Sequence, residues 1–275
     1  MIGVIKSFIK TNPYTYKYIF RGQLKLTMEQ EIKLLPMLLN GKHGCAIDIG
    51  ANHGIYTEYL ISKCKMQVHA FEPQPLLCEQ LTRVFRHFDG YTIYNMGLSS
   101  QESELVLHIP FKNGLRRDGY ATFQDIKEPH ESIRVPVKTL DSFRFENVDF
   151  IKIDVEGFEF AVLQGARETI IKNKPIMLIE VEQRHLNRAS HSEVKTVIDI
   201  INHVIEVGYQ CYCYVDKKFV CVDELNLNEL QNVKNEHPKN TKYVNNFFFS
   251  QSQCKFLICE LWQNMLISLH RATIK

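Results

Sequence analysis

The chain has 275 residues, of which 45% are hydrophobic and 23% charged, with 33 Lys and Arg against 31 Asp and Glu. This composition is typical of a soluble globular protein and excludes a disordered, collagen-like or coiled-coil chain. A formal charge of +2 gives too weak a field to favour nucleic acid as a partner. No apolar run reaches about 18 residues, so the sequence predicts no transmembrane segment.

The cysteines and the first residues of the chain indicate a reducing, cytoplasmic compartment. The 8 cysteines include no C-x-x-C pair, which argues against a zinc module or a small disulfide scaffold, and we interpret them as reduced thiols. Residues 1–10 lack the apolar stretch and cleavage site of a secretory signal. We therefore expect a cytoplasmic protein. The apolar residues of this segment suit a helix that packs on its own domain better than a membrane anchor.

Taken in chain order, the elements predict an α/β protein. Residues 1–43 have a polar, helical pattern and are predicted to form an N-terminal cap. Strands and helices then alternate through a core over 44–223, as in a doubly wound sheet. Strands are predicted over 45–49, 67–72, 91–95, 102–110, 133–137, 148–153, 175–181, 209–215 and 219–223, and helices over 53–63, 158–171, 194–207 and from Pro75 onward.

Two segments lack a clear period. Residues 110–131 are rich in glycine and polar residues and are interpreted as an active-site loop that sets acceptor specificity. Residues 224–275 are divided into a polar loop, a final strand over 246–250 and a C-terminal extension. The run Phe247-Phe248-Phe249 is predicted to pack in the core rather than to form an exposed patch.

The sharpest motif is D-I-G-A-N-H-G over 48–54, at the end of the first predicted strand. Gly50 and Gly54 allow a tight turn and close approach to a ligand, and the amides that open the following helix point into the crevice. A dinucleotide site would use G-x-G-x-x-G, whereas here Asp48 places a carboxylate in the turn. Because a carboxylate repels a second anion, the motif favours S-adenosylmethionine over NAD.

Glu72 ends the second predicted strand, near the spacing of roughly 20 residues at which an acid accepts hydrogen bonds from ribose hydroxyls. Pro73 would stop the strand so that the carboxylate faces the crevice. The alternative is a surface acid that favours the start of the helix at Pro75.

Together these segments resemble the FkbM-type methyltransferase family, within the S-adenosylmethionine-dependent enzymes. The resemblance spans about 45–185 and is carried by six segments: A-I-D-I-G-A-N-H-G-I-Y at 46–56, F-E-P-Q-P at 71–75, N-M-G-L-S at 95–99, V-K-T-L-D at 137–141, D-F-I-K-I-D-V-E-G-F-E at 149–159 and I-M-L-I-E-V at 176–181.

The resemblance implies a Rossmann-like, seven-stranded doubly wound methyltransferase sheet that binds S-adenosylmethionine. It also implies O-methylation of a hydroxyl on a sugar or sugar-bearing metabolite, so the partner would be a small-molecule or glycan acceptor. By match to the family's first motif, the methionine and ribose parts of the cofactor would contact Asp48, Gly50, Asn52 and Gly54. Glu72 would bind the ribose, and Asn95 and Gly97 would lie near the adenine. Gly97 departs from the family, in which alanine is frequent.

Charged residues follow the most apolar predicted strand, at Lys152, Asp154 and Glu156. Removing each charge from water costs several kcal/mol, so these groups should be paired or used in catalysis. The period of two places Lys152 and Asp154 on one side, at the strand end where open α/β sheets bind ligands. Asp154 and Glu156 are predicted to act as general base or to orient the acceptor, with Lys152 tuning their pKa and His185 as a further candidate. The alternative is an ion pair that only orders the turn.

A metal site is a second interpretation of the same region. Glu180, Glu182 and His185 end the next strand and would face the same crevice. Asp154, Glu180 and Glu182 could hold a divalent metal that polarises vicinal hydroxyls, but oxygen ligands at such loose spacing are not diagnostic, and a metal is not favoured.

Other interpretations stay open. Arg116 and Arg117 suit a clamp for an anionic sugar or carboxylate, and suit a solvated loop equally well. An NAD-dependent oxidoreductase and a non-catalytic partner-binding module are the alternatives to the methyltransferase.

Overall fold

The computed structural model describes residues 29–188, 194–231 and 243–251. Of the predicted N-terminal cap, residues 1–28 lie outside this part. The short helix η1 (Glu31–Leu34) continues into α3 (Leu35–Leu38), where Pro36 stands at the first turn. In these two elements Ile32, Leu35 and Leu38 are buried, so this end of the cap packs on the core.

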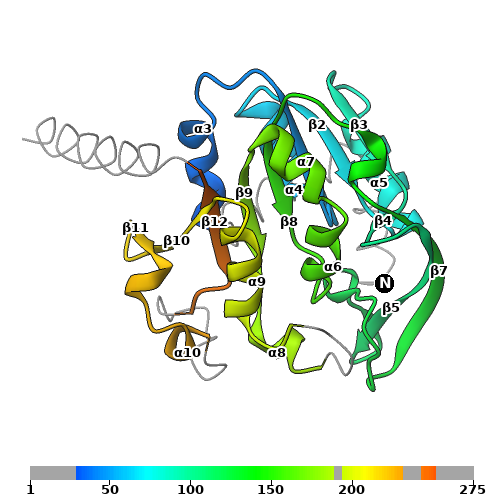
Figure 1. Ribbon diagram of the computed structural model, residues 1–275. Helices are drawn as coiled ribbons and strands as arrows, with labels where there is room; N and C mark the ends of the chain where they lie inside the picture. Colours follow the sequence, from blue (N-terminus) through cyan, green and yellow to red (C-terminus); the bar gives the residue numbers. More distant parts are fainter. Residues whose placement is uncertain (1–28, 189–193, 232–242, 252–275) are drawn as a thin grey trace, which may run out of the picture.

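The main sheet has eight strands in the described residues, in the order β11-β10-β12-β9-β8-β1-β2-β3 (Figure 1). The parallel part consists of β3 (Tyr91–Tyr94), β2 (Gln67–Phe71), β1 (Cys45–Ile49), β8 (Val148–Ile153) and β9 (Ile176–Glu180). The antiparallel part consists of β12 (Asn246–Ser250), β10 (Gln210–Val215) and β11 (Lys218–Cys221). The Rossmann-like α/β fold is confirmed. The sheet exceeds the expected seven strands because the hairpin partner β11 extends its edge.

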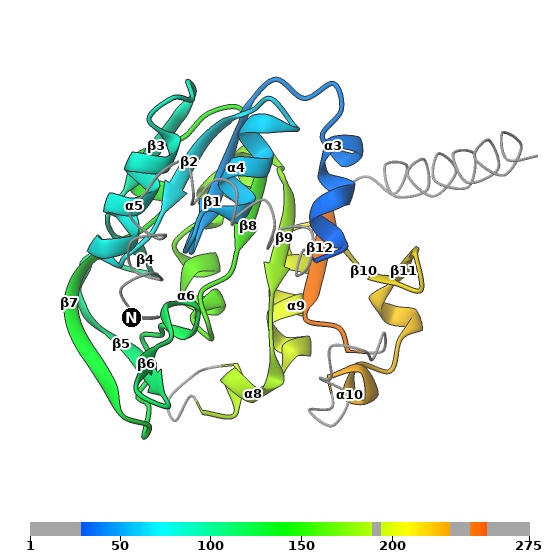
Figure 2. The same ribbon diagram turned by 180° about the vertical axis from the view of Figure 1, so that it is seen from behind.

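Helices cover both faces of the sheet, as Figures 1 and 2 show from opposite sides. Alternate strand residues such as Ile47, Ile151 and Ile179 pack under α6 (Glu159–Gln164), α7 (Arg167–Asn173) and α9 (Val197–Ile205). Their neighbours Ala46 and Phe150 face α3, α4 (Ile55–Ser62) and α5 (Pro75–Phe85). The period of two therefore decides which helices each strand residue meets.

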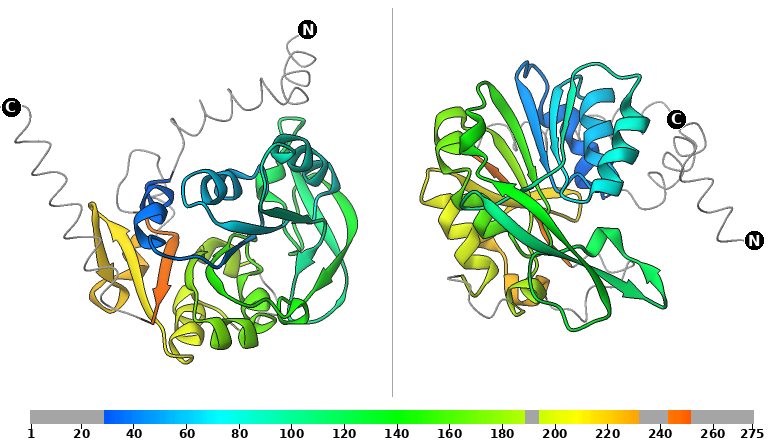
Figure 3. Two further views of the ribbon diagram at one scale, coloured as in Figure 1. Left: turned by 90° about the horizontal axis from the view of Figure 1, so that it is seen from above. Right: turned by 90° about the vertical axis from the view of Figure 1, so that its right-hand side faces the viewer.

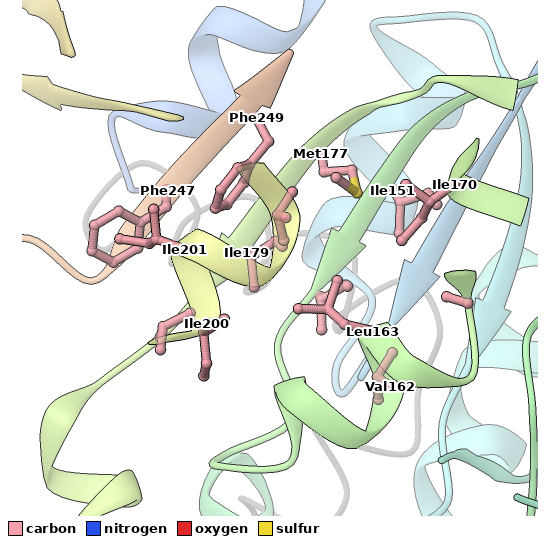
Figure 4. Packing of buried hydrophobic residues seen from close by; sticks show 14 of the residues in the cluster. Ile151, Val162, Leu163, Ile170, Met177, Ile179, Ile200, Ile201, Phe247 and Phe249 are labelled. Carbon is pink, nitrogen blue, oxygen red and sulfur yellow. The ribbon is translucent and has the colours of Figure 1, made fainter. Parts of the chain in front are cut away.

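The last strand lies inside the sheet. β12 pairs with β9 on one side and β10 on the other, so the segment predicted as a C-terminal addition supplies part of the core. Phe247, Phe248 and Phe249 are fully buried, which confirms the packing prediction. In Figure 4, Phe247 and Phe249 lie with Ile200 and Ile201 of α9 in one hydrophobic cluster.

A second, four-stranded sheet has the order β4-β7-β5-β6 and is formed by β4 (Gly97–Leu98), β5 (Ser103–Lys112), β6 (Leu115–Arg116) and β7 (His130–Lys138). β5 and β7 are long antiparallel partners that run beside the main sheet (Figure 3). The segment predicted as an aperiodic loop contains β6, η2 (Asp118–Tyr120) and the start of β7. This sheet places that segment over the carboxyl end of the main sheet, since Asp118 and Gly119 share a cavity wall with Gly50.

Some helices differ from the prediction. The helix expected over 158–171 is divided into α6 and α7 at Gly165, where a Cβ would lie 2.0 Å from the Ser99 carbonyl oxygen. The polar segment after 223 contains α10 (Leu227–Leu230), and η3 (Asp141–Phe143), α8 (Gln183–Leu186) and η4 (Val222–Glu224) are further short helices. In the described ranges no helix is long and apolar enough to cross a membrane.

Candidate active site

The turn after β1 brings two parts of the site together. Gly50 has φ +82, and a Cβ there would lie 1.8 Å from the Asp154 carbonyl oxygen, so the turn passes directly over the end of β8. The Asp154 amide donates to the Ile49 carbonyl at 3.0 Å. Gly54 has φ +78, and a Cβ added there would lie 2.5 Å from Leu81 Cδ2. Gly50 is thus needed for close approach at the site, and Gly54 for helix packing.

Glu72 is held at the carboxyl end of β2. Its Oε2 accepts the Asn52 amide and its Oε1 accepts the Gln74 amide, both at 2.8 Å. Burial raises the pKa of Glu72 to about 7, although the two backbone donors oppose the shift. Asn95 donates to the carbonyls of Glu72 and Pro73 at 3.1 Å each, so it supports this turn.

A small cavity of about 50 Å³ lies beside Glu72. Its wall includes Gly50 and Asn52, as predicted, and Gly97. A Cβ at Gly97 would lie 2.8 Å from Phe123 Cζ, so the glycine leaves room for this aromatic ring. The predicted cofactor residues are therefore gathered here, apart from Asn95, Gly54 and Asp48.

Asp48 and Lys152 belong to a second group, on the face of the sheet covered by α3 and α4. Asp48 is buried, accepts the Thr57 hydroxyl at 2.5 Å and has its pKa raised to about 6 by burial. Lys152 is its partner in register on β8 and is 1% exposed. Its Nζ lies 3.8 Å from Glu180 Oε2 and 4.0 Å from Asp154 Oδ2.

Two residues that the sequence analysis missed complete this lysine cluster. Asn246 of β12 has its Oδ1 3.2 Å from Lys152 Nζ, and the Tyr56 ring of α4 lies 5.0 Å from the same atom. Burial opposes the charge of Lys152, but Asp154 and Glu180 outweigh it and raise its pKa. The cluster lines a cavity of about 190 Å³ through Asp48, Lys152 and Asp154.

Glu156 and His185 form a separate pair. His185 Nε2 lies 3.2 Å from Glu156 Oε2. Burial lowers the pKa of His185 to about 4, and burial, reinforced by Asp154, raises the pKa of Glu156 well above its usual range. The imidazole is therefore neutral near pH 7, and burial favours the uncharged form of the neighbouring carboxyl group.

The backbone at this pair is held in an unusual conformation. Glu156 has φ +51 and Gly157 has φ +97. The Thr122 hydroxyl donates to the Glu156 carbonyl and the Gln124 side chain donates to the Gly157 carbonyl, each at 2.8 Å. A strained residue fixed from a neighbouring sheet is typical of a functional position.

The four predicted catalytic residues thus occupy two positions. Lys152 and Asp154 lie together, as the strand period predicts, and Glu156 with His185 lies beside a third cavity of about 440 Å³. Asp154 lines the first and second cavities, and Glu156 lines the first and third. The cavities therefore follow one another along the carboxyl edge of the sheet.

The carboxylates of the alternative metal site point to different partners. Glu180 Oε1 accepts Asn245 Nδ2 at 2.7 Å, whereas Glu182 accepts the Tyr243 hydroxyl at 2.7 Å and pairs with Arg184. Within 29–188, 194–231 and 243–251, no group of three or more His, Cys, Asp or Glu residues could hold a metal ion.

The loop over the site is fixed by contacts that motifs do not reveal. Gln74 is buried, donates to the Asp118 carbonyl at 3.0 Å and accepts from Arg116 at 3.1 Å. Arg116 also pairs with Asp118 at 2.7 Å and Glu131 at 3.0 Å. Arg116 is therefore a structural residue of the loop, and the interpretation of it as an anion clamp is wrong.

The fold and the site define a class of protein. A doubly wound sheet with a glycine turn after its first strand, a buried carboxylate after its second and no dinucleotide fingerprint is the arrangement of an S-adenosylmethionine-dependent methyltransferase. The family model described as the Methyltransferase FkbM domain matches residues 48–211. The chain belongs to the FkbM methyltransferase family, which depends on S-adenosylmethionine.

Several solved structures are similar to the chain at low sequence identity. Methyltransferase FkbM from Methylobacillus flagellatus KT is 19% identical, with a TM-score of 0.48, over 75% of this chain and 43% of that one. The chain therefore spans less than half of that protein. An S-adenosylmethionine-dependent methyltransferase from Aquifex aeolicus is 12% identical, with a TM-score of 0.42, over 87% and 97%. Aeropyrum pernix fibrillarin, with natively bound S-adenosyl-L-methionine, is 14% identical, with a TM-score of 0.41, over 79% and 74%.

No curated protein matches the chain.

The residues present suit this cofactor chemically. Asn52 Oδ1 is buried and has no hydrogen-bond partner among the described residues, so it offers an acceptor inside the crevice. Glu72 uses one lone pair of each oxygen on the backbone and keeps others for hydroxyl donors. The space beside Glu72 is small, and Asp118, Gly119 and Phe123 form part of its wall.

Proposed function

We propose that the chain transfers a methyl group from S-adenosylmethionine to a hydroxyl oxygen of a sugar or sugar-bearing acceptor. The observation that carries the proposal is the position of Glu156. This residue lines both the cavity beside Glu72 and the larger cavity next to it, so its carboxyl group stands between the proposed cofactor and acceptor sites.

The cofactor side is assigned to the residues around Glu72. We expect the ribose hydroxyls to donate to Glu72, with Gly50 and Asn52 against the ligand and Gly97 near the adenine. Asp48, Lys152 and Asp154 line the adjoining cavity, where the carboxylates suit the ammonium group. The sulfonium would lie beside Asp154, which lines both cavities, with its methyl group toward the cavity that Glu156 shares. When bound, the cofactor supplies an electrophilic methyl group, and the protein has to align the acceptor oxygen with it.

The acceptor proton can leave through the Glu156–His185 pair. The ionised carboxylate of Glu156 would take the hydroxyl proton, and the neutral imidazole of His185, with Nε2 3.2 Å from Glu156 Oε2, would position it. The carboxylate loses its negative charge as the sulfonium loses its positive charge, so charge balances across the site. The raised pKa of Glu156 makes its carboxylate a stronger base than an exposed one, and the lowered pKa of His185 keeps the imidazole neutral.

Lys152 and Asp154 are proposed to position the reactants. Lys152 is buried against Asp154 and Glu180, so Asp154 is held at the end of β8 between two cavities. Its side chain is one third exposed and faces the crevice. In this scheme Asp154 orients the bound methyl donor, and Glu156 acts as the base.

The experiment measures binding and turnover separately. Calorimetry with S-adenosylmethionine, S-adenosylhomocysteine and NAD identifies the cofactor, and transfer of labelled methyl to a panel of monosaccharides, glycosides and nucleotide sugars identifies the acceptor. Glu156→Gln should bind S-adenosylhomocysteine as the parent does and lose most turnover, about 100-fold or more. Binding without turnover on any acceptor would favour a non-catalytic module, and preference for NAD would contradict the proposal.

A further inference from the structure

The cavity beside the Glu156–His185 pair is bordered by cations. Lys112 and Arg117 come from the ends of β5 and β6, and Arg184 and Arg188 come from α8 and the residues after it. We infer that this cavity selects an acceptor that carries an anionic group, a carboxylate or a phosphate, beside the hydroxyl to be methylated. The inference rests on the proposed function, because it specifies the acceptor of that site.

The four cations differ in whether a neighbouring carboxylate already neutralises their charge. Arg184 forms a close pair with Glu182, with Nη2 donating to Oε1 at 2.8 Å, so it is largely neutralised. Arg117 Cζ lies 4.7 Å from the centroid of the Tyr120 ring, both residues line the cavity, and no carboxylate pairs with Arg117 among the described residues. Arg117 and Arg188 are therefore the cations best placed to meet a ligand.

Acidic residues on the cavity wall do not cancel these charges. Glu128 is exposed, and Glu156 lies 3.2 Å from the neutral His185, where burial raises its pKa and disfavours its charged form. The fields of Arg184 and Arg188 reach the imidazole, since both arginines lower the pKa of His185. Lys112, Arg117 and Arg188 thus leave a surplus of positive charge against Glu128.

The size and lining of the cavity restrict the ligand further. A volume of about 440 Å³ lies within the usual range for small-molecule sites and accommodates a substituted sugar. Tyr120 presents an exposed aromatic ring beside Arg117, and such a ring suits the apolar face of a pyranose. Guanidinium groups bind carboxylate and phosphate through two parallel hydrogen bonds, so both anions fit the same clamp.

Paired probes test the inference. Calorimetry at low salt compares D-glucuronate with D-glucose, and glucose 6-phosphate with glucose, on the full chain with and without S-adenosylhomocysteine. We expect at least one anionic sugar to bind tenfold or more tightly than glucose. Preference for glucuronate identifies a carboxylate site, and preference for glucose 6-phosphate identifies a phosphate site.

Substitutions inside and outside the cavity distinguish binding by its cations from a general effect of the protein's charge. The double variant Arg117→Gln, Arg188→Gln should lose the anion preference about tenfold or more, whereas Arg83→Gln on the surface of α5 should keep it. Equal binding of charged and neutral sugars, binding of neither, or an unchanged preference in the double variant would overturn the inference. If the parent chain still binds S-adenosylhomocysteine when one of these results is obtained, only the inference about the acceptor fails. If the parent chain does not bind S-adenosylhomocysteine, the proposed function itself is contradicted.

Discussion

Cofactor affinity should depend on pH through Glu72. Its pKa is raised to about 7, and ribose hydroxyls donate more strongly to an ionised carboxylate than to a protonated one. With a pKa of about 7, the ionised fraction rises from about a tenth near pH 6 to about nine tenths near pH 8. The affinity for S-adenosylhomocysteine should therefore rise about tenfold, or about 1.4 kcal/mol, over this range.

The same titration predicts a change in stability without ligand. A carboxyl group whose pKa is higher in the folded chain than in the unfolded chain destabilises the fold as it ionises. The pKa of Glu72 rises from an ordinary value of 4.5 to about 7 on folding, which corresponds to about 3 kcal/mol. The free energy of unfolding should fall by this order between about pH 4.5 and pH 7, and stay at the lower level above it.

The substitution Glu72→Gln removes the charge but also disturbs the backbone. Both carboxylate oxygens accept amides, from Asn52 and Gln74, whereas a glutamine has one oxygen and an amino group that cannot accept. One buried N–H would lose its partner, at about 1–3 kcal/mol. We therefore expect a less stable variant, whose weak S-adenosylhomocysteine binding does not change between pH 6 and pH 8.

Calorimetric titration across that range provides the measurement. Asp48→Asn is the matched control, because Asp48 lies on the other cavity and burial raises its pKa to about 6. Asp48 makes the smallest of the contributions to the pKa of Glu72, so most of the pH dependence above 6 should be preserved in this variant. A flat affinity in the parent chain, or the same slope in Glu72→Gln, would refute the assignment of Glu72 to the ribose.

Three further outcomes follow from packing and charge. Lys152→Met leaves buried carboxylates without their cation and should lower the free energy of unfolding by about 3–5 kcal/mol in urea, whereas Lys172→Met, in an exposed pair, should change it far less. Gly50→Ala should displace the end of β8 and abolish S-adenosylhomocysteine binding, and Gly41→Ala, with a similar φ and open space at Cβ, reports the conformational strain alone. In Glu156→Gln, a rate profile that keeps the parent's pH dependence would place the base elsewhere.

The local pattern was sufficient to predict the strands that carry the site. β8 matches its predicted range because a continuous apolar, β-branched run has few alternatives to a buried parallel strand. The same pattern predicted that Lys152 and Asp154 share a side, and the structure confirms it. Spacing also predicted that Glu72 follows the second strand and faces the crevice, and the structure places its carboxyl group in the wall of a cavity at the end of β2.

Contacts between distant segments could not be predicted in this way. Asn246 reaches Lys152 across 94 positions, because β12 enters the sheet beside β9, and strand period does not specify which strand pairs with which. The sequence left a ligand clamp and a solvated loop equally open for Arg116, because its carboxylate partners, Asp118 and Glu131, meet it only through the second sheet. The adjacent Arg117 has the same chemistry, and only its place on the cavity wall distinguishes it.

The arrangement explains why one strand end carries so many ionisable groups. Lys152 is buried near the end of β8, where the carboxylates of Asp154 and Glu180 stabilise its charge. The ammonium group of Lys152 in turn stabilises the charged forms of these two carboxylates. Because these opposite charges attract one another, Asp154 is held at the point where the turn at Gly50 passes over the end of β8. Glu156, two residues further, lies beyond the lysine's contacts and pairs with His185 instead. In the proposed mechanism, the carboxyl group that accepts the proton is thereby separated from the carboxylates that pair with Lys152.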